Sequence, residues 1–193
     1  MFSQDYWNIQ YNTKQTGWNI GYASPPVVLY FEKIENKNLE ILIPGAGLGF
    51  EVEALYNMGF TNLYYSDFAP EASNAFENRC PEFPKDQILT GDFFALNKSF
   101  DFIVEQTFFS SLPPDLRDEY ARKMRSLLKP GGKLVGLFFN RNFQPGKPPY
   151  GGSETEYVLL FSQYFNAVKF IPELNSIKPR LGTELWAEIS NTD

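Results

Sequence analysis

The sequence predicts an α/β fold, a doubly wound and mostly parallel sheet of seven strands with helices on both faces. Short apolar runs alternate with longer helical segments along most of the 193 residues, which is typical of parallel strands joined by crossover helices. Turns containing glycine or proline separate the elements. A chain of this length buries roughly 70% of its unfolded surface. We therefore expect residues 1–193 to form one domain, with ligands bound at the carboxyl ends of the strands.

The expected strands are short runs rich in apolar residues and bounded by polar residues, glycine or proline. In chain order they are residues 39–43, 63–65, 87–90, 102–104, 134–139, 167–171 and 184–189. The first run ends directly at Pro44-Gly45, which is the profile of a buried strand that leads into a tight turn.

Proline near the first position and glycine after the last position mark the expected helices. In chain order they are residues 27–31 after Pro25, 49–58 ended by Gly59, 70–79 with Glu71 in the first turn, 114–128 closed by Lys129-Pro130-Gly131-Gly132, and 154–164. Two segments lie outside this series of elements. Residues 1–24 form an aromatic N-terminal segment in which 12–24 is expected to be loop, and residues 140–152 form a connection rich in glycine and proline.

The charge balance disfavours nucleic acid as a partner. Seventeen Lys and Arg against 23 Asp and Glu give a net charge of −6, the wrong sign for binding a phosphate backbone. No basic region precedes an apolar run at the N-terminus, and no apolar stretch approaches the ~20 residues that cross a bilayer. The single cysteine, Cys80, permits no internal disulfide. We expect a cytoplasmic monomer that acts on a small molecule and binds neither nucleic acid nor a membrane.

The sequence contains no histidine. Ser-His-Asp and Cys-His catalysis, histidine metal sites and histidine general bases are therefore excluded together. A magnesium site made of carboxylates alone stays open, but we expect no metal.

The first strand leads into a glycine-rich turn, Pro44-Gly45-Ala46-Gly47-Leu48-Gly49, that opens a helix. Glycine at such a turn permits a tight bend and the close approach of a ligand to the backbone. The third glycine of a dinucleotide-binding turn would fall at position 50, which is Phe50. The spacing therefore favours a nucleoside without phosphates over a dinucleotide, and a purely structural turn is the alternative.

Polar residues follow three of the expected strands at the edge where that turn lies. Asp67 follows the second strand, where an acid can accept hydrogen bonds from both ribose hydroxyls. Asp92 follows the third strand and can accept from an adenine amino group that Phe93 or Phe94 covers. Glu105-Gln106-Thr107-Phe108-Phe109 follows the fourth strand and is expected to face the same crevice. Either aspartate can instead be only a cap, and the nearby phenylalanines can be core residues.

Polar groups in this order are typical of the S-adenosylmethionine site of class I methyltransferases. Further segments carry a more specific pattern: Thr16-Gly17-Trp18-Asn19-Ile20-Gly21, Ile43 to Gly49, Thr107-Phe108-Phe109, Leu112 to Arg117, Leu128-Lys129-Pro130-Gly131-Gly132 and Pro148-Pro149-Tyr150. With these segments the chain resembles the thiopurine S-methyltransferase family, and most closely its plant-type halide and thiol methyltransferase branch. The resemblance extends from about residue 6 to residue 178.

The resemblance implies a Rossmann-like class I methyltransferase fold, S-adenosylmethionine as cofactor and an N-terminal lid, residues 1–24, that covers it. The cofactor-binding residues that it implies, together with those inferred above, are Trp7, Tyr11, Trp18, Gly45, Gly47, Gly49, Asp67, Phe68, Asp92, Phe93, Glu105 and Gln106. The resemblance also implies Tyr150 as a substrate-binding residue that orients the substrate. Phe109 and Arg141 are expected to bind the substrate because of their places after the fourth strand and in the substrate loop. The substrate loop is expected at residues 140–152.

Some residues depart from the family pattern on the substrate side. Glu105 stands where Asp is usual, Gln106 where Tyr is common, and Lys147 where Gly is typical. Arg141, Lys147 and Arg180 can form a positive mouth that admits an anion, or they can be ordinary surface charges. The expected acceptor is a small soft nucleophile: a thiol, bisulfide, thiocyanate, halide or thiopurine-like compound.

Methyl transfer to such an acceptor is an in-line displacement with a neutral thioether as leaving group, so an anionic acceptor needs no base. A nicotinamide-dependent oxidoreductase and a cofactor-binding module without turnover are the alternative functions. Phe50 in the turn argues against the first alternative, and the intact glycine turn with Asp67 and Asp92 argues against loss of the cofactor.

Overall fold

The computed structural model describes residues 2–190, so residues 1 and 191–193 of the expected domain lie outside the described part. The strands are β1 (Ile41–Pro44), β2 (Leu63–Asp67), β3 (Ile88–Thr90), β4 (Phe100–Gln106), β5 (Leu128–Phe139), β6 (Ala167–Pro172) and β7 (Glu184–Ser190). The α-helices are α1 (Gln4–Asn12), α2 (Pro25–Phe31), α3 (Phe50–Asn57), α4 (Pro70–Arg79), α5 (Arg117–Leu127) and α6 (Glu154–Phe161). Short 3₁₀ turns occupy Lys85–Gln87, Phe93–Ala95, Phe109–Ser111 and Pro114–Leu116.

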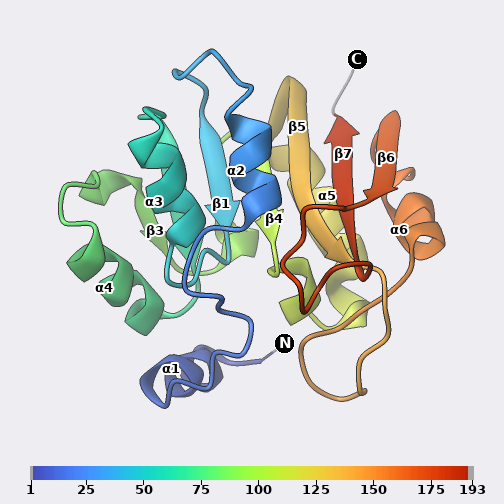
Figure 1. Cartoon of the computed structure of the whole chain (residues 1–193), viewed down its shortest axis with the longest axis horizontal. Coiled ribbons are helices and arrows are strands. Elements are labelled where there is room, and N and C mark those ends of the chain that lie inside the picture. The colour runs from blue at the N-terminus through green and yellow to red at the C-terminus, as the bar shows by residue number, and fades with distance from the viewer. Residues whose placement is uncertain (1, 191–193) are drawn as a thin grey trace.

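The strands form one seven-stranded sheet in the order β3-β2-β1-β4-β5-β7-β6 (Figure 1). Strands β1 to β5 pair in parallel, and β7 runs antiparallel to both of its neighbours, β5 and β6. The sheet is thus doubly wound and mostly parallel, as the sequence predicted. Among residues 2–190, no helix is both long and apolar enough to cross a bilayer.

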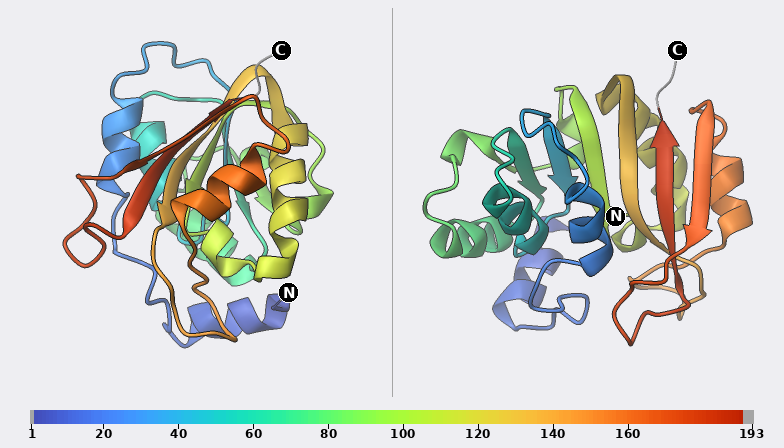
Figure 2. Two further views of the ribbon diagram at one scale, coloured as in Figure 1. Left: turned by 90° about the vertical axis from the view of Figure 1, so that its right-hand side faces the viewer. Right: turned by 45° about the horizontal axis from the view of Figure 1, so that its top comes forward.

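Each face of the sheet has its own hydrophobic core, and Figure 2 shows helices on both sides. The core under α2, α3 and α4 includes Val27, Phe31, Ile41, Ile43, Val52, Leu55, Tyr65 and Phe76. The core under α5 and α6 includes Leu42, Ile103, Tyr120, Met124, Leu134, Phe138, Tyr157 and Phe161. Each of these large side chains is almost fully buried, which contributes about 1.5–3 kcal/mol for a Val, Leu, Ile or Phe. Successive strand residues alternate between the two cores because strand side chains alternate between faces.

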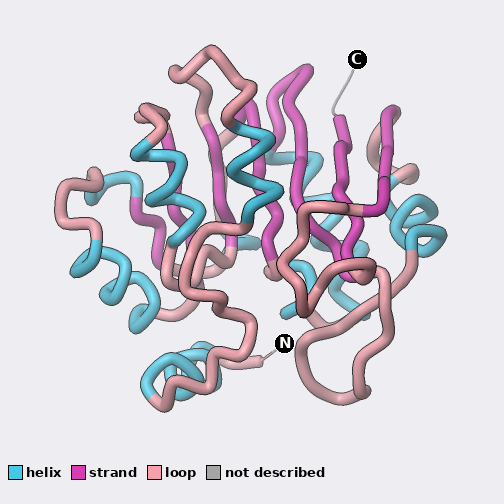
Figure 3. Tube along the Cα trace, viewed as in Figure 1, coloured by secondary structure: helices cyan, strands magenta, loops and turns pink. Residues whose placement is uncertain are grey.

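The carboxyl ends of β1 and β4 define the place where a ligand can bind. The strand order reverses between these two neighbours, which opens a crevice at that edge of a doubly wound sheet. In Figure 1 this is the lower edge, and α1 and residues 140–152 lie below it. Figure 3 shows that loops make up most of this edge.

The main difference from the sequence prediction is α1, which the aromatic N-terminal segment did not indicate. Ser3 caps the helix, since its hydroxyl accepts a hydrogen bond from the Tyr6 N–H at 3.2 Å. The helix has no fully buried residue, so no apolar stripe marks it in the sequence. A smaller difference concerns Lys129-Pro130-Gly131-Gly132, which lies within β5 rather than in a loop after α5.

Candidate active site

A cavity of about 530 Å³ lies at the carboxyl edge of the sheet. This volume is within the range typical of small-molecule sites. The parts of the chain that line it are the N-terminal segment, the ends of β1 and β2, the loop after β4, and the loops at 139–149 and 179–180. The lining residues used below are Trp7, Tyr11, Trp18, Gly45, Asp67, Phe68, Thr107, Phe108, Ser110, Ser111, Arg141, Phe143, Lys147, Pro148, Pro149 and Arg180.

The glycines of the turn after β1 serve different contacts. Gly47 has a φ of 55°, and a Cβ atom there would lie 2.8 Å from the Tyr11 hydroxyl oxygen. Gly49 has a φ of 70°, and its Cβ would lie 2.3 Å from the Phe76 ring, which belongs to the core. Gly47 therefore permits close approach of the N-terminal segment to the turn, whereas Gly49 is required by packing. The expectation that Gly49 contacts the cofactor has no support in this placement.

Asp67 ends β2 and lines the cavity with a nearly buried carboxyl group. One carboxyl oxygen accepts from the Gly47 N–H and the other from the Ala69 N–H, each at 2.8 Å. Burial raises the pKa of Asp67 to about 6, although these backbone hydrogen bonds act in the opposite direction. A carboxylate has about four acceptor sites, so it can hold the turn and α4 in place and still accept from a ligand hydroxyl.

The aromatic residues predicted for the lid lie together over the cavity. The ring centroids of Trp7 and Trp18 are 5.6 Å apart and those of Tyr11 and Trp18 are 5.9 Å apart, both edge to face. Helix α1 is attached to the start of α4, because the Gln4 side-chain amide donates to the Phe68 carbonyl at 2.9 Å. The segment thus covers one side of the cavity in the structure.

Cationic side chains form another part of the cavity lining. Arg141, Lys147 and Arg180 all line the cavity, so the structure brings together the three residues considered for a positive mouth. Arg180 also donates to the Trp18 carbonyl at 2.7 Å and pairs with Glu184 at 3.5 Å. It therefore connects the N-terminal segment with the loop before β7.

The loop after β4 brings Thr107 and Phe108 to the cavity, in a segment that the sequence analysis expected at this crevice. Thr107 has a φ of 64°, a strained conformation for a β-branched residue and one that is enriched at functional sites. Phe108 follows it and lines the cavity. A Cβ at Gly45 would lie 2.5 Å from the Phe108 ring, so the glycine lets this loop approach the turn. The two adjacent phenylalanines at 108 and 109 gave no signal of which one faces the cavity.

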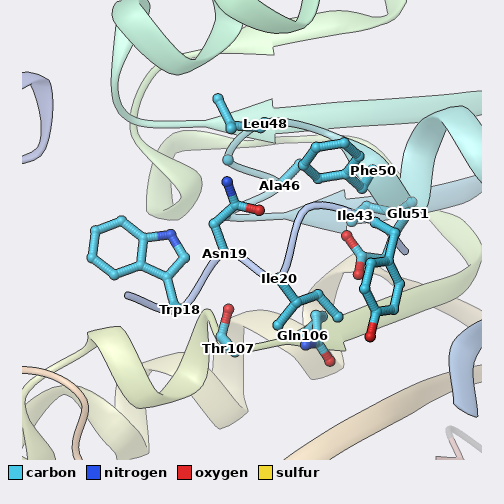
Figure 4. A pocket seen from close by; sticks show the side chains of 13 residues that line it. Trp18, Asn19, Ile20, Ile43, Ala46, Leu48, Phe50, Glu51, Gln106 and Thr107 are labelled. Carbon is cyan, nitrogen blue, oxygen red and sulfur yellow. The ribbon is translucent and has the colours of Figure 1, made fainter. Parts of the chain in front are cut away.

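A second, smaller cavity of about 50 Å³ adjoins the first one, since Trp18, Gly45 and Thr107 line both (Figure 4). Gln106 lines the smaller cavity, and its side-chain oxygen is buried without a hydrogen-bond partner among residues 2–190. An unpaired buried acceptor costs free energy and fits a ligand that brings an N–H or ammonium donor. The Glu51 carboxylate, also in this lining, accepts from the Ser24 N–H at 3.0 Å.

Glu105 is the clearest correction to the expected site. Its side chain has no exposed surface and points to the face that α5 covers, opposite to that of Gln106, because neighbouring strand residues alternate. Its carboxyl oxygens accept from the Phe109 N–H at 2.9 Å and from the Tyr120 hydroxyl at 2.5 Å. Burial raises the pKa of Glu105 to about 7. The expectation that this side chain faces the crevice is wrong.

Two expected substrate-binding residues also lie outside the cavity lining described here. Phe109 is buried in the core, 5.0 Å from both the Tyr120 and Phe138 ring centroids. Tyr150 is half-buried, and its N–H donates to the Ser110 carbonyl at 2.6 Å. Of the expected substrate residues, Arg141 alone is on the lining. In place of Phe109 and Tyr150, their sequence neighbours Phe108, Pro148 and Pro149 line the cavity.

Asp92 and Phe93 have the alternative, structural roles: Asp92 is a cap and Phe93 is a core residue. The Asp92 carboxylate is exposed and caps a 3₁₀ turn by accepting from the Phe94 N–H at 2.9 Å. Phe93 is buried and its ring centroid lies 5.0 Å from that of Phe108. Neither residue is in the lining of the two cavities among residues 2–190.

Comparison with known proteins identifies relatives of this chain. The family described as thiopurine S-methyltransferase matches residues 2–179. A probable thiol methyltransferase 2 of Arabidopsis thaliana is 31% identical over 183 residues, which cover 92% of this chain and 81% of that protein. Thiocyanate methyltransferase 1 of Brassica oleracea is 30% identical over 183 residues, covering 91% of this chain and 81% of that protein.

A solved structure of similar fold is the 1,6-didemethyltoxoflavin-N1-methyltransferase of Burkholderia thailandensis with S-adenosylhomocysteine bound. Its TM-score is 0.75 at 17% identity, over 98% of this chain and 87% of that one. At this identity the likeness shows the fold alone. The glycine turn, the buried Asp67 and the unpaired Gln106 oxygen fit an adenosyl group with an amino-acid end. On the sequence match over residues 2–179 and this fold, the chain belongs to the thiopurine S-methyltransferase family of S-adenosylmethionine-dependent methyltransferases.

Proposed function

We propose that this methyltransferase acts on a small soft nucleophile: a thiolate, bisulfide, thiocyanate, halide or thiopurine-like anion. The observation that supports this most is that one cavity combines two kinds of lining. In our proposal Asp67 and the glycine turn form its cofactor side, and Arg141, Lys147 and Arg180 form its acceptor side. The first set suits a ribose and the second an anion. The names of two plant relatives give a thiol and thiocyanate as acceptors of those proteins.

The cofactor side has acceptors for two polar parts of S-adenosylmethionine, the ribose hydroxyls and the amino group. When bound, this cofactor supplies a methyl group on a positively charged sulfur. In our proposal Asp67 accepts from the ribose hydroxyls, and the Gln106 side-chain oxygen accepts from the amino group. Trp7, Tyr11 and Trp18 cover the cofactor, and an aromatic face stabilises a nearby cation by about 0.5–2 kcal/mol.

For the proposed transfer, cations and apolar residues on the acceptor side are more important than a general base. Arg141 and Lys147 raise the local concentration of an anion beside a protein whose net charge is −6. Phe108 and Phe143 exclude water from it. Holding the acceptor in line with the methyl group is a proximity effect that can supply roughly 7–11 kcal/mol. An anionic acceptor carries no proton to remove, so a chain without histidine can perform the transfer.

We also propose that the protein works as a cytoplasmic monomer without nucleic acid. The net charge of −6 and the single cysteine support this setting.

The test is to incubate the purified protein with S-adenosylmethionine and separate acceptors: thiocyanate, iodide, bisulfide, benzenethiol and 6-mercaptopurine. S-adenosylhomocysteine and the methylated product are measured together and should form in equal amounts. Binding of S-adenosylhomocysteine with no product from any acceptor would instead identify a cofactor-binding module. Binding of NAD in its place would identify an oxidoreductase.

A further inference from the structure

Arg117, the first residue of α5, has a charge of the wrong sign for its position in the helix. A cation at a helix N-terminus opposes the helix dipole, and the acids Asp118 and Glu119 follow it in the same turn. Its Nε atom is also buried without a hydrogen-bond partner among residues 2–190, which is a further cost. Helix stability therefore does not explain an arginine here, and a residue that breaks a local rule often serves a function.

The contacts of Arg117 connect the two loops that form the acceptor side of the cavity. Its Nη2 atom donates to the Gly151 carbonyl at 2.5 Å, at the end of the substrate loop. Its guanidinium carbon lies 4.8 Å from the ring centroid of Phe109, in the loop after β4. The first loop carries Arg141 and Lys147, and the second carries Phe108 and Ser110. Arg117 itself is not on the cavity lining.

The substrate loop is closed at its base, so a clamp on Gly151 acts on the whole loop. The Gly152 N–H donates to the Arg141 carbonyl at 3.1 Å, in an isolated antiparallel bridge. A Cβ atom at Gly151 would lie 1.7 Å from the Arg141 carbonyl oxygen, so the close approach depends on glycine. The Tyr150 N–H adds a second link, to the Ser110 carbonyl at 2.6 Å.

We propose that Arg117 is a positioning residue for the acceptor. It holds the substrate loop against the loop after β4 and thereby fixes where Arg141 and Lys147 meet the anion. The inference rests on the proposed function, since it assumes an anionic acceptor at these cations. It requires no contact between Arg117 and the cofactor, so loss of the clamp should change acceptor binding and spare cofactor binding.

The test compares Arg117→Met with Arg117→Lys, and uses Arg122→Met as the matched control. Arg122 is exposed on the same helix and pairs only with Asp118 among the salt bridges of residues 2–190, so its loss should have little effect. Three quantities are measured: amide hydrogen exchange of residues 141–152, the Kd of S-adenosylhomocysteine, and the Kd of thiocyanate for the S-adenosylhomocysteine complex. None of them needs turnover, so product assays report separately on the proposed function.

Arg117→Met should speed exchange of residues 141–152 and raise the thiocyanate Kd about tenfold, the lower end for a hydrogen bond to a charged group. The S-adenosylhomocysteine Kd should stay within about twofold. Arg117→Lys keeps a donor but loses the planar group over Phe109. Its thiocyanate Kd should therefore lie between those of the wild type and Arg117→Met. Gly151→Ala opens the base of the substrate loop by another route, because its Cβ would meet the Arg141 carbonyl oxygen, and it should give the same pattern. Combined with Arg117→Met, it should add little, because both variants release the same loop.

Several results would overturn the inference. One is unchanged exchange of residues 141–152 in Arg117→Met. Another is faster exchange with the thiocyanate Kd of the wild type, which would make the contact structural only. An equal loss of S-adenosylhomocysteine and thiocyanate binding would show a general disturbance of the site. Absence of thiocyanate binding to the wild-type complex would also overturn it.

Discussion

Asp67 and Glu105 are both buried carboxyl groups at strand ends, and their surroundings separate their roles. Asp67 faces the cavity and binds two backbone N–H groups of the turns around it. Glu105 lies on the other face of the sheet and binds the Phe109 N–H and the Tyr120 hydroxyl. Burial raises the pKa of Asp67 to about 6 and that of Glu105 to about 7. The first therefore acts on ligand binding and the second on stability.

The first prediction concerns Asp67 and the cofactor product. The ionised carboxylate accepts two hydroxyl hydrogen bonds, so S-adenosylhomocysteine affinity should rise with pH up to the pKa of about 6 and then level off. Asp67→Asn should weaken binding at about pH 7.5 by about 1.5–3 kcal/mol. It should also remove the step near pH 6. Calorimetry over this pH range measures both, and an unchanged affinity in the variant would mean that Asp67 only holds the turn.

The second prediction concerns Glu105 and unfolding. Its folded-state pKa of about 7 lies above the ordinary value of 4.5, so its contribution is complete below about pH 4.5 and is lost as pH rises toward 7. Glu105→Gln keeps an acceptor for the Phe109 N–H without a charge. Relative to the wild type, its free energy of unfolding should therefore gain roughly 3 kcal/mol between about pH 4.5 and about pH 7.

Urea unfolding at a series of pH values measures this difference. A constant difference between Glu105→Gln and the wild type across that range would show that Glu105 does not change its protonation state there.

The sequence predicted the position of a residue correctly where that residue lies directly at the end of a strand. The glycine turn and Asp67 are contiguous with strand ends, so the strand pattern alone located them at the carboxyl edge. Glu105 was misplaced because one residue of register decides the face of the sheet. No local pattern distinguishes Phe108 from Phe109 or indicates the left-handed backbone of Thr107.

At the scale of elements, the strands and the longer helices followed from their own apolar patterns, whereas α1 did not. An isolated helix of this length is marginal in water, and α1 depends on contacts with α4 that are far away in sequence. The Gln4 amide reaches the Phe68 carbonyl, and the Glu71 N–H donates to the Asn8 side chain at 3.4 Å. Such contacts cannot be inferred from residues 4–12 alone.

The third prediction is that this N-terminal segment acts as a lid. The contacts that hold it to the rest of the chain include side-chain hydrogen bonds such as those of Gln4 and Arg180, and its aromatic rings cover the cavity. We therefore expect low protection without ligand and slower amide exchange of residues 4–22 when S-adenosylhomocysteine binds. Helix α5 serves as the internal control, since its amides should exchange equally in both states. Equal exchange of residues 4–22 with and without ligand would contradict a lid.

At the scale of the whole molecule, the reversal of strand order between β1 and β4 places the site. It brings together the glycine turn, Asp67 and the loop after β4. The alternation of strands and helices was sufficient to predict this edge. The sequence did not decide whether Arg141, Lys147 and Arg180 meet at one cavity, because this depends on the long-range packing of loops. This packing gives a protein of net charge −6 a cationic approach to its cavity.

The central claim is methyl transfer to a soft anion without a general base, and pH dependence tests it most directly. With S-adenosylmethionine saturating, kcat/KM for thiocyanate should be nearly flat from about pH 6.5 to about pH 9, because this acceptor is ionised throughout. For a thiol, log kcat/KM should rise with slope one up to the pKa of that thiol, and the limb should move when thiols of different acidity are compared. A limb near pH 7 shared by thiocyanate and every thiol would instead show that an ionisable group of this protein acts as a base.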